Sequence, residues 1–154
     1  MIKRLLKSQQ IGSSMIEVLV TMIIISLGLL GQAAMIAHAS KSNNAAFMRS
    51  QATLLSYDIL ERLRLNRALA VAGNFNVQFV TPGSDPSAAI SGSTIDKNEL
   101  RDWKSNIEQA LPSGDGFITV DGSGNVTIKI SWCEVVKETS CTNTPTIFIT
   151  QSAI

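Results

Sequence analysis

The strongest pattern near the start of the chain is an apolar run from Met15 to Ala37, in which Glu17 is the only charged residue. At about 1.5 Å per residue, a helix over this run would be roughly 35 Å long, and the hydrocarbon core of a bilayer is about 30 Å thick. The pattern therefore predicts a single membrane-spanning helix. Lys3, Arg4 and Lys7 precede it, and the positive-inside rule then places the N-terminus in the cytoplasm.

After the apolar run, hydrophobic residues recur every three to four positions, which is the spacing of one helical face. These positions are Met48, Ala52, Leu55, Ile59 and Leu63. No proline or glycine lies between Gly31 and Gly73, so we expect one helix from about Ser13 to Asn66. On its other side, Asp58 can pair with Arg62 and Glu61 with Arg64. This half should bury one face only.

The middle of the chain combines a loop with a second helix. Residues 73–93 are rich in Gly, Ser, Asn and Pro and contain a short β-like run from Phe75 to Val80, so they are read as a linker or loop. Asp96, with Glu99 three positions later, is typical of a helix start with a capping arrangement. The expected buried stripe is Leu100, Trp103, Ile107, Ala110 and Leu111, and Pro112 and Gly114 end the helix.

The last third of the chain reads as β-structure. Strands are expected at Phe117–Val120 and Val126–Trp132, because polar and apolar residues alternate and the Asp121–Asn125 segment between them is a strong turn signal. A third strand is expected at Thr146–Thr150. The predicted fold class is α+β: a long N-terminal helix whose second half packs on a small antiparallel sheet.

Charge and cysteine content narrow the functional classes. The whole chain has a formal charge of +1, but without residues 1–12 it has 10 basic and 12 acidic residues, or −2, which argues against a nucleic-acid partner. Cys133 and Cys141 are the two cysteines, and a disulfide between them would close a short loop worth roughly 2.5 kcal/mol. Free thiols or a metal site are the alternatives, although one His and two Cys cannot complete a four-ligand zinc site. No metal or other cofactor is expected.

Glu17 is the least ordinary residue of the apolar run, because an ionised side chain in hydrocarbon costs at least ~3 kcal/mol. The short basic leader, Gly12, and a Glu at the fifth position after it together resemble a class III prepilin signal, found in type IV pilins and pseudopilins. The resemblance implies that a prepilin peptidase cuts between Gly12 and Ser13 and methylates Ser13. It also implies that Glu17 pairs with the N-terminal amine of a neighbouring subunit.

Two further segments, 50–59 and 61–67, resemble the helix end of PilV-type minor pilins, as do Trp103 and the Leu111–Gly114 ending. The resemblance implies the type IV pilin fold and three parts: a leader (1–12), a membrane and assembly segment (13–37) and a periplasmic domain (38–154). It implies a non-enzymatic minor pilin that begins in the bacterial inner membrane and ends in an extracellular pilus. The implied partners are other minor pilins, the major pilin, the inner-membrane assembly platform and a tip adhesin.

Other interpretations remain open at this point. A type II secretion minor pseudopilin would carry the same signal and helix. A DNA-uptake pilin would use Arg62, Arg64 and Arg67, although the negative mature charge argues against it. An ordinary secretory signal would be cut after Ala39, in the small-residue site around His38. We expect no catalysis, since no nucleophile, base and acid grouping stands out.

Overall fold

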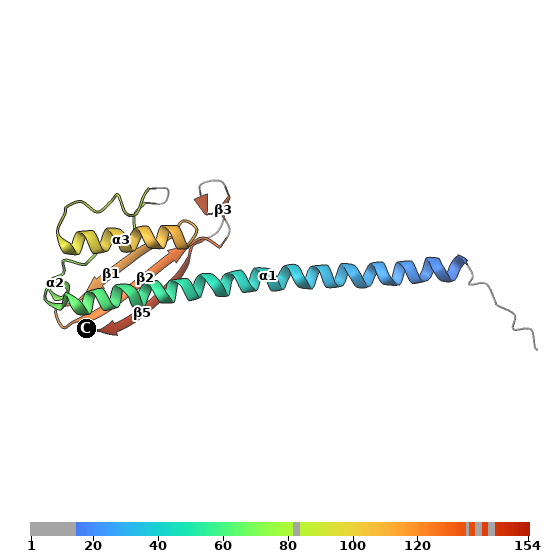
Figure 1. Cartoon of the computed structure of the whole chain (residues 1–154), viewed down its shortest axis with the longest axis horizontal. Helices are drawn as coiled ribbons and strands as arrows, with labels where there is room; N and C mark the ends of the chain where they lie inside the picture. The colour runs from blue at the N-terminus through green and yellow to red at the C-terminus, as the bar shows by residue number, and fades with distance from the viewer. Residues whose placement is uncertain (1–14, 82–83, 135, 138–139, 142–143) are drawn as a thin grey trace, which may run out of the picture. The chain divides into compact units, whose positions relative to one another are not determined.

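The computed structural model describes residues 15–81, 84–134, 136–137, 140–141 and 144–154 (Figure 1). The chain divides into two compact units, one up to Ser42 and one over Asn43–Ile154. Helix α1 (Met15–Leu65) contributes to both units. The remaining elements belong to the second unit and are α2 (Arg67–Val71), α3 (Ile95–Ala110), β1 (Asp115–Val120), β2 (Asn125–Trp132), β3 (Val136–Lys137), β4 (Ser140–Cys141) and β5 (Thr146–Ala153).

The second unit is built on a three-stranded antiparallel sheet in the order β1-β2-β5. Val120 pairs with Val126 across the β1–β2 turn, and Trp132 pairs with Thr146 at the far end of β2 and β5. Alternate residues of β2 are buried, so one face of the sheet is covered. Figure 1 shows the second half of α1 and α3 running alongside these strands. β3 and β4 form a separate two-stranded ladder.

The hydrophobic core joins the second half of α1, α3 and the inner face of the sheet. Trp103 is fully buried, and its Nε1 donates a hydrogen bond to the Leu55 carbonyl oxygen at 2.9 Å. Its ring lies directly on Gly116, where an added Cβ would stand 2.4 Å from the ring carbons. The absence of a side chain at Gly116 therefore lets α3 approach β1 closely.

The long helix and the three main strands confirm the predicted α+β class. Helix α1 matches the expected Ser13–Asn66 closely, although Ser13 lies outside the described residues. Asn66 interrupts the helix with φ −113° and ψ 39°, and the five-residue α2 follows. The third strand runs three residues further than expected, to Ala153. The ladder of β3 and β4 was not predicted.

Some local expectations were wrong. α3 begins at Ile95 with Thr94 as its N-cap residue, and no side-chain hydrogen bond caps it. Glu99 pairs with Arg62 of α1. Ala110 is exposed rather than buried, since it borders an open groove between α1 and α3. Most of the Phe75–Val80 run is irregular, and a single bridge joins Val77 to Ile118.

The predicted disulfide lies partly outside what the structure describes. Cys133 follows β2 and is buried, with 3% of its surface exposed. The backbone of Cys141 pairs with Val136 in the small ladder. The side chain of Cys141 is outside the described residues, so the Cys133–Cys141 disulfide stays a prediction.

Candidate functional site

The first half of α1 presents apolar side chains that no described residue of its own unit covers. Every residue from Met15 to Ser42 is exposed. The large apolar side chains retain 47% to 85% of their surface. They point in all directions around the helix axis, as the consecutive residues Met22, Ile23, Ile24 and Ile25 illustrate, because each is turned by about 100° from the last. A helix that is apolar on every side is suited to an apolar environment outside the chain. By length and composition this helix could cross a membrane, a test that a cleaved signal sequence also passes.

Two hydroxyl side chains inside this apolar stretch donate hydrogen bonds to the helix itself. The Thr21 hydroxyl donates to the Val18 carbonyl oxygen at 2.9 Å, and the Ser26 hydroxyl donates to the Met22 carbonyl oxygen at 2.7 Å. Such bonds to the preceding turn remove the need for water. The stretch is therefore compatible with lipid at Thr21 and Ser26.

Glu17 stands in the first turn of α1. A carboxylate there is favoured by the positive end of the helix dipole. Gly12 and Ser13, the predicted cleavage site, lie outside the described residues. The geometry thus establishes where Glu17 sits on the helix, while its pairing with a neighbouring subunit's amine stays a prediction.

A second polar cluster lies within the second unit, where Arg62 joins α1 to α3. Its Nη2 is 3.0 Å from Asp58 Oδ2, and its Nη1 pairs with Glu99 of α3. Partial burial alone would lower the pKa of Arg62, but the hydrogen bonds that its guanidinium donates to Asp58 and Glu99 outweigh it and raise the pKa above its ordinary value. The guanidinium of Arg62 therefore stays positively charged and links α1 to α3 through Glu99, which makes it a clamp between the two helices.

An open groove of about 470 Å³ runs beside this clamp. Its wall is apolar at three positions and otherwise carries amide and charged groups, with α1 contributing Gln51, Leu54, Leu55, Asp58 and Arg62, and α3 contributing Asn106, Gln109 and Ala110.

The other two arginines of the predicted basic patch, Arg64 and Arg67, bind other groups of the chain. Arg64 pairs with Glu61 at 2.6 Å, and Arg67 Nε donates to the Ile154 carbonyl oxygen at 3.0 Å.

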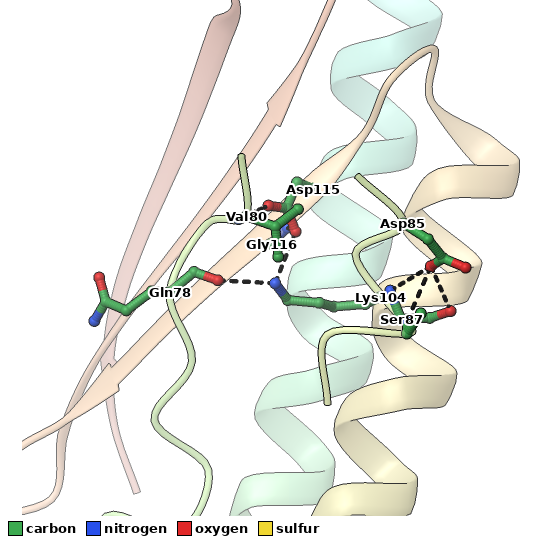
Figure 2. A network of polar contacts seen from close by, with 8 residues as sticks. Gln78, Val80, Asp85, Ser87, Lys104, Asp115 and Gly116 are labelled. Carbon is green, nitrogen blue, oxygen red and sulfur yellow. Dashed lines mark hydrogen bonds and ion pairs between the residues drawn. The ribbon is translucent and has the colours of Figure 1, made fainter. Parts of the chain in front are cut away.

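The buried ion pair of Lys104 and Asp115 was missed by the sequence analysis. Lys104 is fully buried, and its Nζ donates to Asp115 Oδ1 at 2.9 Å and to the Gln78 carbonyl oxygen at 2.8 Å (Figure 2). Asp115 also accepts the backbone amides of Val80 and Gly116, both at 2.7 Å. The signal was present, because Lys104 falls on the buried face of α3, where a charge requires a buried partner.

No metal centre emerges from these clusters, because nowhere in the described ranges do three or more His, Cys, Asp or Glu side chains gather where they could hold an ion. Comparisons of the chain with protein-family models, with curated proteins and with solved structures gave no match. The candidate functional region therefore rests on the chain's own features, and the uncovered first half of α1 with Glu17 at its start is the most distinctive of them.

Proposed function

We propose that this chain is a type IV minor prepilin of the PilV type, with the type IV pilin fold. In this proposal a prepilin peptidase removes residues 1–12, and the first half of α1 holds the subunit in the bacterial inner membrane. The subunit then enters the pilus with other minor pilins and the major pilin, through the inner-membrane assembly platform, and helps to prime assembly and to present a tip adhesin. It performs no catalysis.

The observation that carries the proposal is a helix half that is apolar and exposed on every side over its described residues, with one carboxylate in its first turn. A helix that only anchors would gain by losing that carboxylate, since a charge in hydrocarbon costs at least ~3 kcal/mol. A cation supplied by a neighbouring subunit's new N-terminus would offset this cost. Gly12 at five positions before Glu17 supports that reading.

The first experiment determines the N-terminus of the protein in the membrane fraction by intact mass and peptide sequencing. A chain that starts at Ser13, with or without one methyl group, supports prepilin processing. A chain that starts at Ser40 contradicts the proposal, because it indicates an ordinary secretory signal. Co-purification of secretion-system subunits instead of pilus subunits would redirect the proposal to a type II secretion minor pseudopilin.

The second experiment replaces Glu17. Glu17→Ala should leave membrane insertion intact or improve it, since the charge is removed from the apolar run, while the number of pili falls. Thr21→Ala, one turn further along the same helix, is the matched control and should leave both insertion and pilus number unchanged. Normal pilus number and composition in Glu17→Ala would contradict a pairing role for the carboxylate.

A further inference from the structure

The two edges of the three-stranded sheet differ in how their backbone groups are satisfied. At the β1 edge, the three outward-pointing amides all have partners within the chain. The N–H of Gly116 donates to Asp115 Oδ1 at 2.7 Å, that of Ile118 to the Val77 carbonyl oxygen at 3.0 Å, and that of Val120 to Asn76 Oδ1 at 2.7 Å. The segment before α3 thus closes this edge.

The β5 edge carries the opposite arrangement. In an antiparallel ladder, successive residues direct their N–H and C=O groups to alternate sides. The backbone N–H and C=O of Ile118 point away from β2. The backbone groups of its partner on β2, Ile128, therefore point away from β1 and bond to Thr150 of β5. The backbone groups of Ile147, Ile149 and Gln151 therefore face the open side. Within the described part of the chain, no hydrogen bond covers them.

None of the usual protective features occurs along β5. Natural edge strands are commonly shielded by charged residues, prolines or bulges. β5 has no charged residue and no proline, and Pro145 lies just outside it. Its register with β2 runs from Thr146 to Ala153 without a bulge. The side chains of Ile147 and Ile149 are 50% and 55% exposed.

We propose that the open edge of β5 binds an extended segment of another protein, which adds a fourth strand to the sheet. Main-chain hydrogen bonds to Ile147, Ile149 and Gln151 would supply affinity, and the exposed isoleucines would select the side chains. This inference is independent of the proposed function, since it uses only the sheet of the second unit.

The chemistry of the edge defines the occupant. A second copy cannot continue the sheet head to tail through its own β1, because the outward amides of that strand are already bonded. The occupant must place apolar side chains beside Ile147 and Ile149, at alternating positions. It should be uncharged there, because β5 has no charged side chain and the cation of Lys129, the partner of Ile149 on β2, is held 4.8 Å from the Phe117 ring centroid on β1. The partner segment is therefore an extended, uncharged strand with alternating apolar residues.

The test uses the full chain in detergent micelles and a synthetic eight-residue peptide of alternating Ile and Thr. Hydrogen exchange of segment 146–153 is measured with and without the peptide. We expect slower exchange at the outward amides of Ile147, Ile149 and Gln151, and no effect from a peptide with a central proline. This readout reports on one edge, so adsorption of peptide to the micelle does not imitate it.

Two lysine substitutions separate the edge from the face. Thr119→Lys lies on the exposed face of the closed strand β1 and should leave the peptide effect intact. Ile149→Lys should weaken binding at least tenfold. If Ile149→Lys does not fold, as judged by Trp103 and Trp132 fluorescence, Gln151→Pro replaces it, because the lost N–H does not bond to β2.

Three results would overturn the proposal. The first is unchanged exchange at saturating peptide, and the second is an equal effect in Ile149→Lys. The third is self-association measured by light scattering, abolished by Ile149→Lys, with protection of segment 146–153 in the absence of peptide. That result would assign the edge to a second copy that pairs β5 with β5.

Discussion

The two halves of α1 use similar apolar residues for different purposes. From Met15 to Ser42 no residue is buried, whereas from Asn43 to Leu65 one face is buried at Met48, Ala52, Ser56, Ile59, Leu60 and Leu63. The first half is apolar around its whole circumference, and the second is amphipathic. The difference teaches that the chain supplies the cover for the second half itself and leaves the first half to its surroundings.

This contrast predicts which property each substitution changes. Changes in the first half should alter partitioning of the chain between water and membrane. Changes in the second unit should alter its free energy of unfolding. Both tryptophans, Trp103 and Trp132, are buried in the second unit, so their fluorescence reports on that unit alone.

The largest expected effect is at Lys104. Lys104→Ala leaves Asp115 buried without its cation, which should lower the free energy of unfolding by about 3–5 kcal/mol. The measurement is urea unfolding of the full chain in detergent, followed by tryptophan fluorescence. Lys41→Ala, at an exposed position in the first unit, is the matched control and should change stability by less than about 0.5 kcal/mol.

A double variant sharpens this result. Lys104→Met with Asp115→Asn removes both charges and keeps one carbonyl oxygen, which can accept from the amide of Val80 or from that of Gly116, so it should recover part of the lost stability. A loss below about 1 kcal/mol in Lys104→Ala would mean that the ion pair is not needed by the core.

The next prediction compares one substitution in each half of α1. Leu27→Arg should disfavour membrane insertion by about 2.5–3.5 kcal/mol, because it places a charge inside the apolar run, while tryptophan-detected unfolding stays the same. Leu63→Ala should do the reverse and lower the free energy of unfolding by about 2–5 kcal/mol without affecting insertion. Carbonate extraction of membranes and urea unfolding measure the two quantities. Equal loss of insertion in both variants would erase the distinction between the halves.

The smallest effect is on acid sensitivity. The carboxylate of Asp121 accepts the Asn125 side-chain amide at 2.7 Å and the backbone amides of Asn125 and Ser123 at 2.8 Å. These bonds lower its pKa below the ordinary 3.8. A pKa that is lower in the folded state stabilises the fold above about pH 4, and this contribution is lost as the pH falls through the folded pKa.

Asp121→Asn should therefore reduce stability slightly at pH 7 and flatten its decline below pH 3.8. The measurement is urea unfolding between pH 2 and 7, with Asp102→Asn on the exposed side of α3 as the control. Residues 18–57 contain no Asp or Glu, so helical circular dichroism from the first half of α1 should not follow this change. An unchanged pH profile in Asp121→Asn would place the acid sensitivity in other carboxylates.

Local periodicity explains what could be predicted from the sequence. The helical stripe from Met48 to Leu63, the alternation in β2 and the Asp121–Asn125 turn are set by residues within a few positions of one another. These features place α1 and the three main strands within a few residues of their observed bounds. The uncovered first half of α1 was visible as an uninterrupted apolar run.

Pairings between distant residues account for most of what was missed. Glu99 looked like a capping residue, yet it binds Arg62, which lies 37 positions earlier. Asp115 and Lys104 are close in sequence, but their burial also depends on the segment from Gln78 to Val80. Charge and spacing within one helix cannot reveal such partners, because the residues that surround them come from segments that are distant in the sequence.

The order of elements along the chain determines when the core can be completed during synthesis. The buried face of α1 ends at Leu63, but β5, whose Phe148 packs against the core, is synthesised about 90 residues later. At ~5–20 residues per second, roughly 5–20 s separate the synthesis of Leu63 from that of β5. During this interval β2 lacks its β5 partner and the core lacks Phe148, so the core of each newly made chain is complete only when β5 has been made.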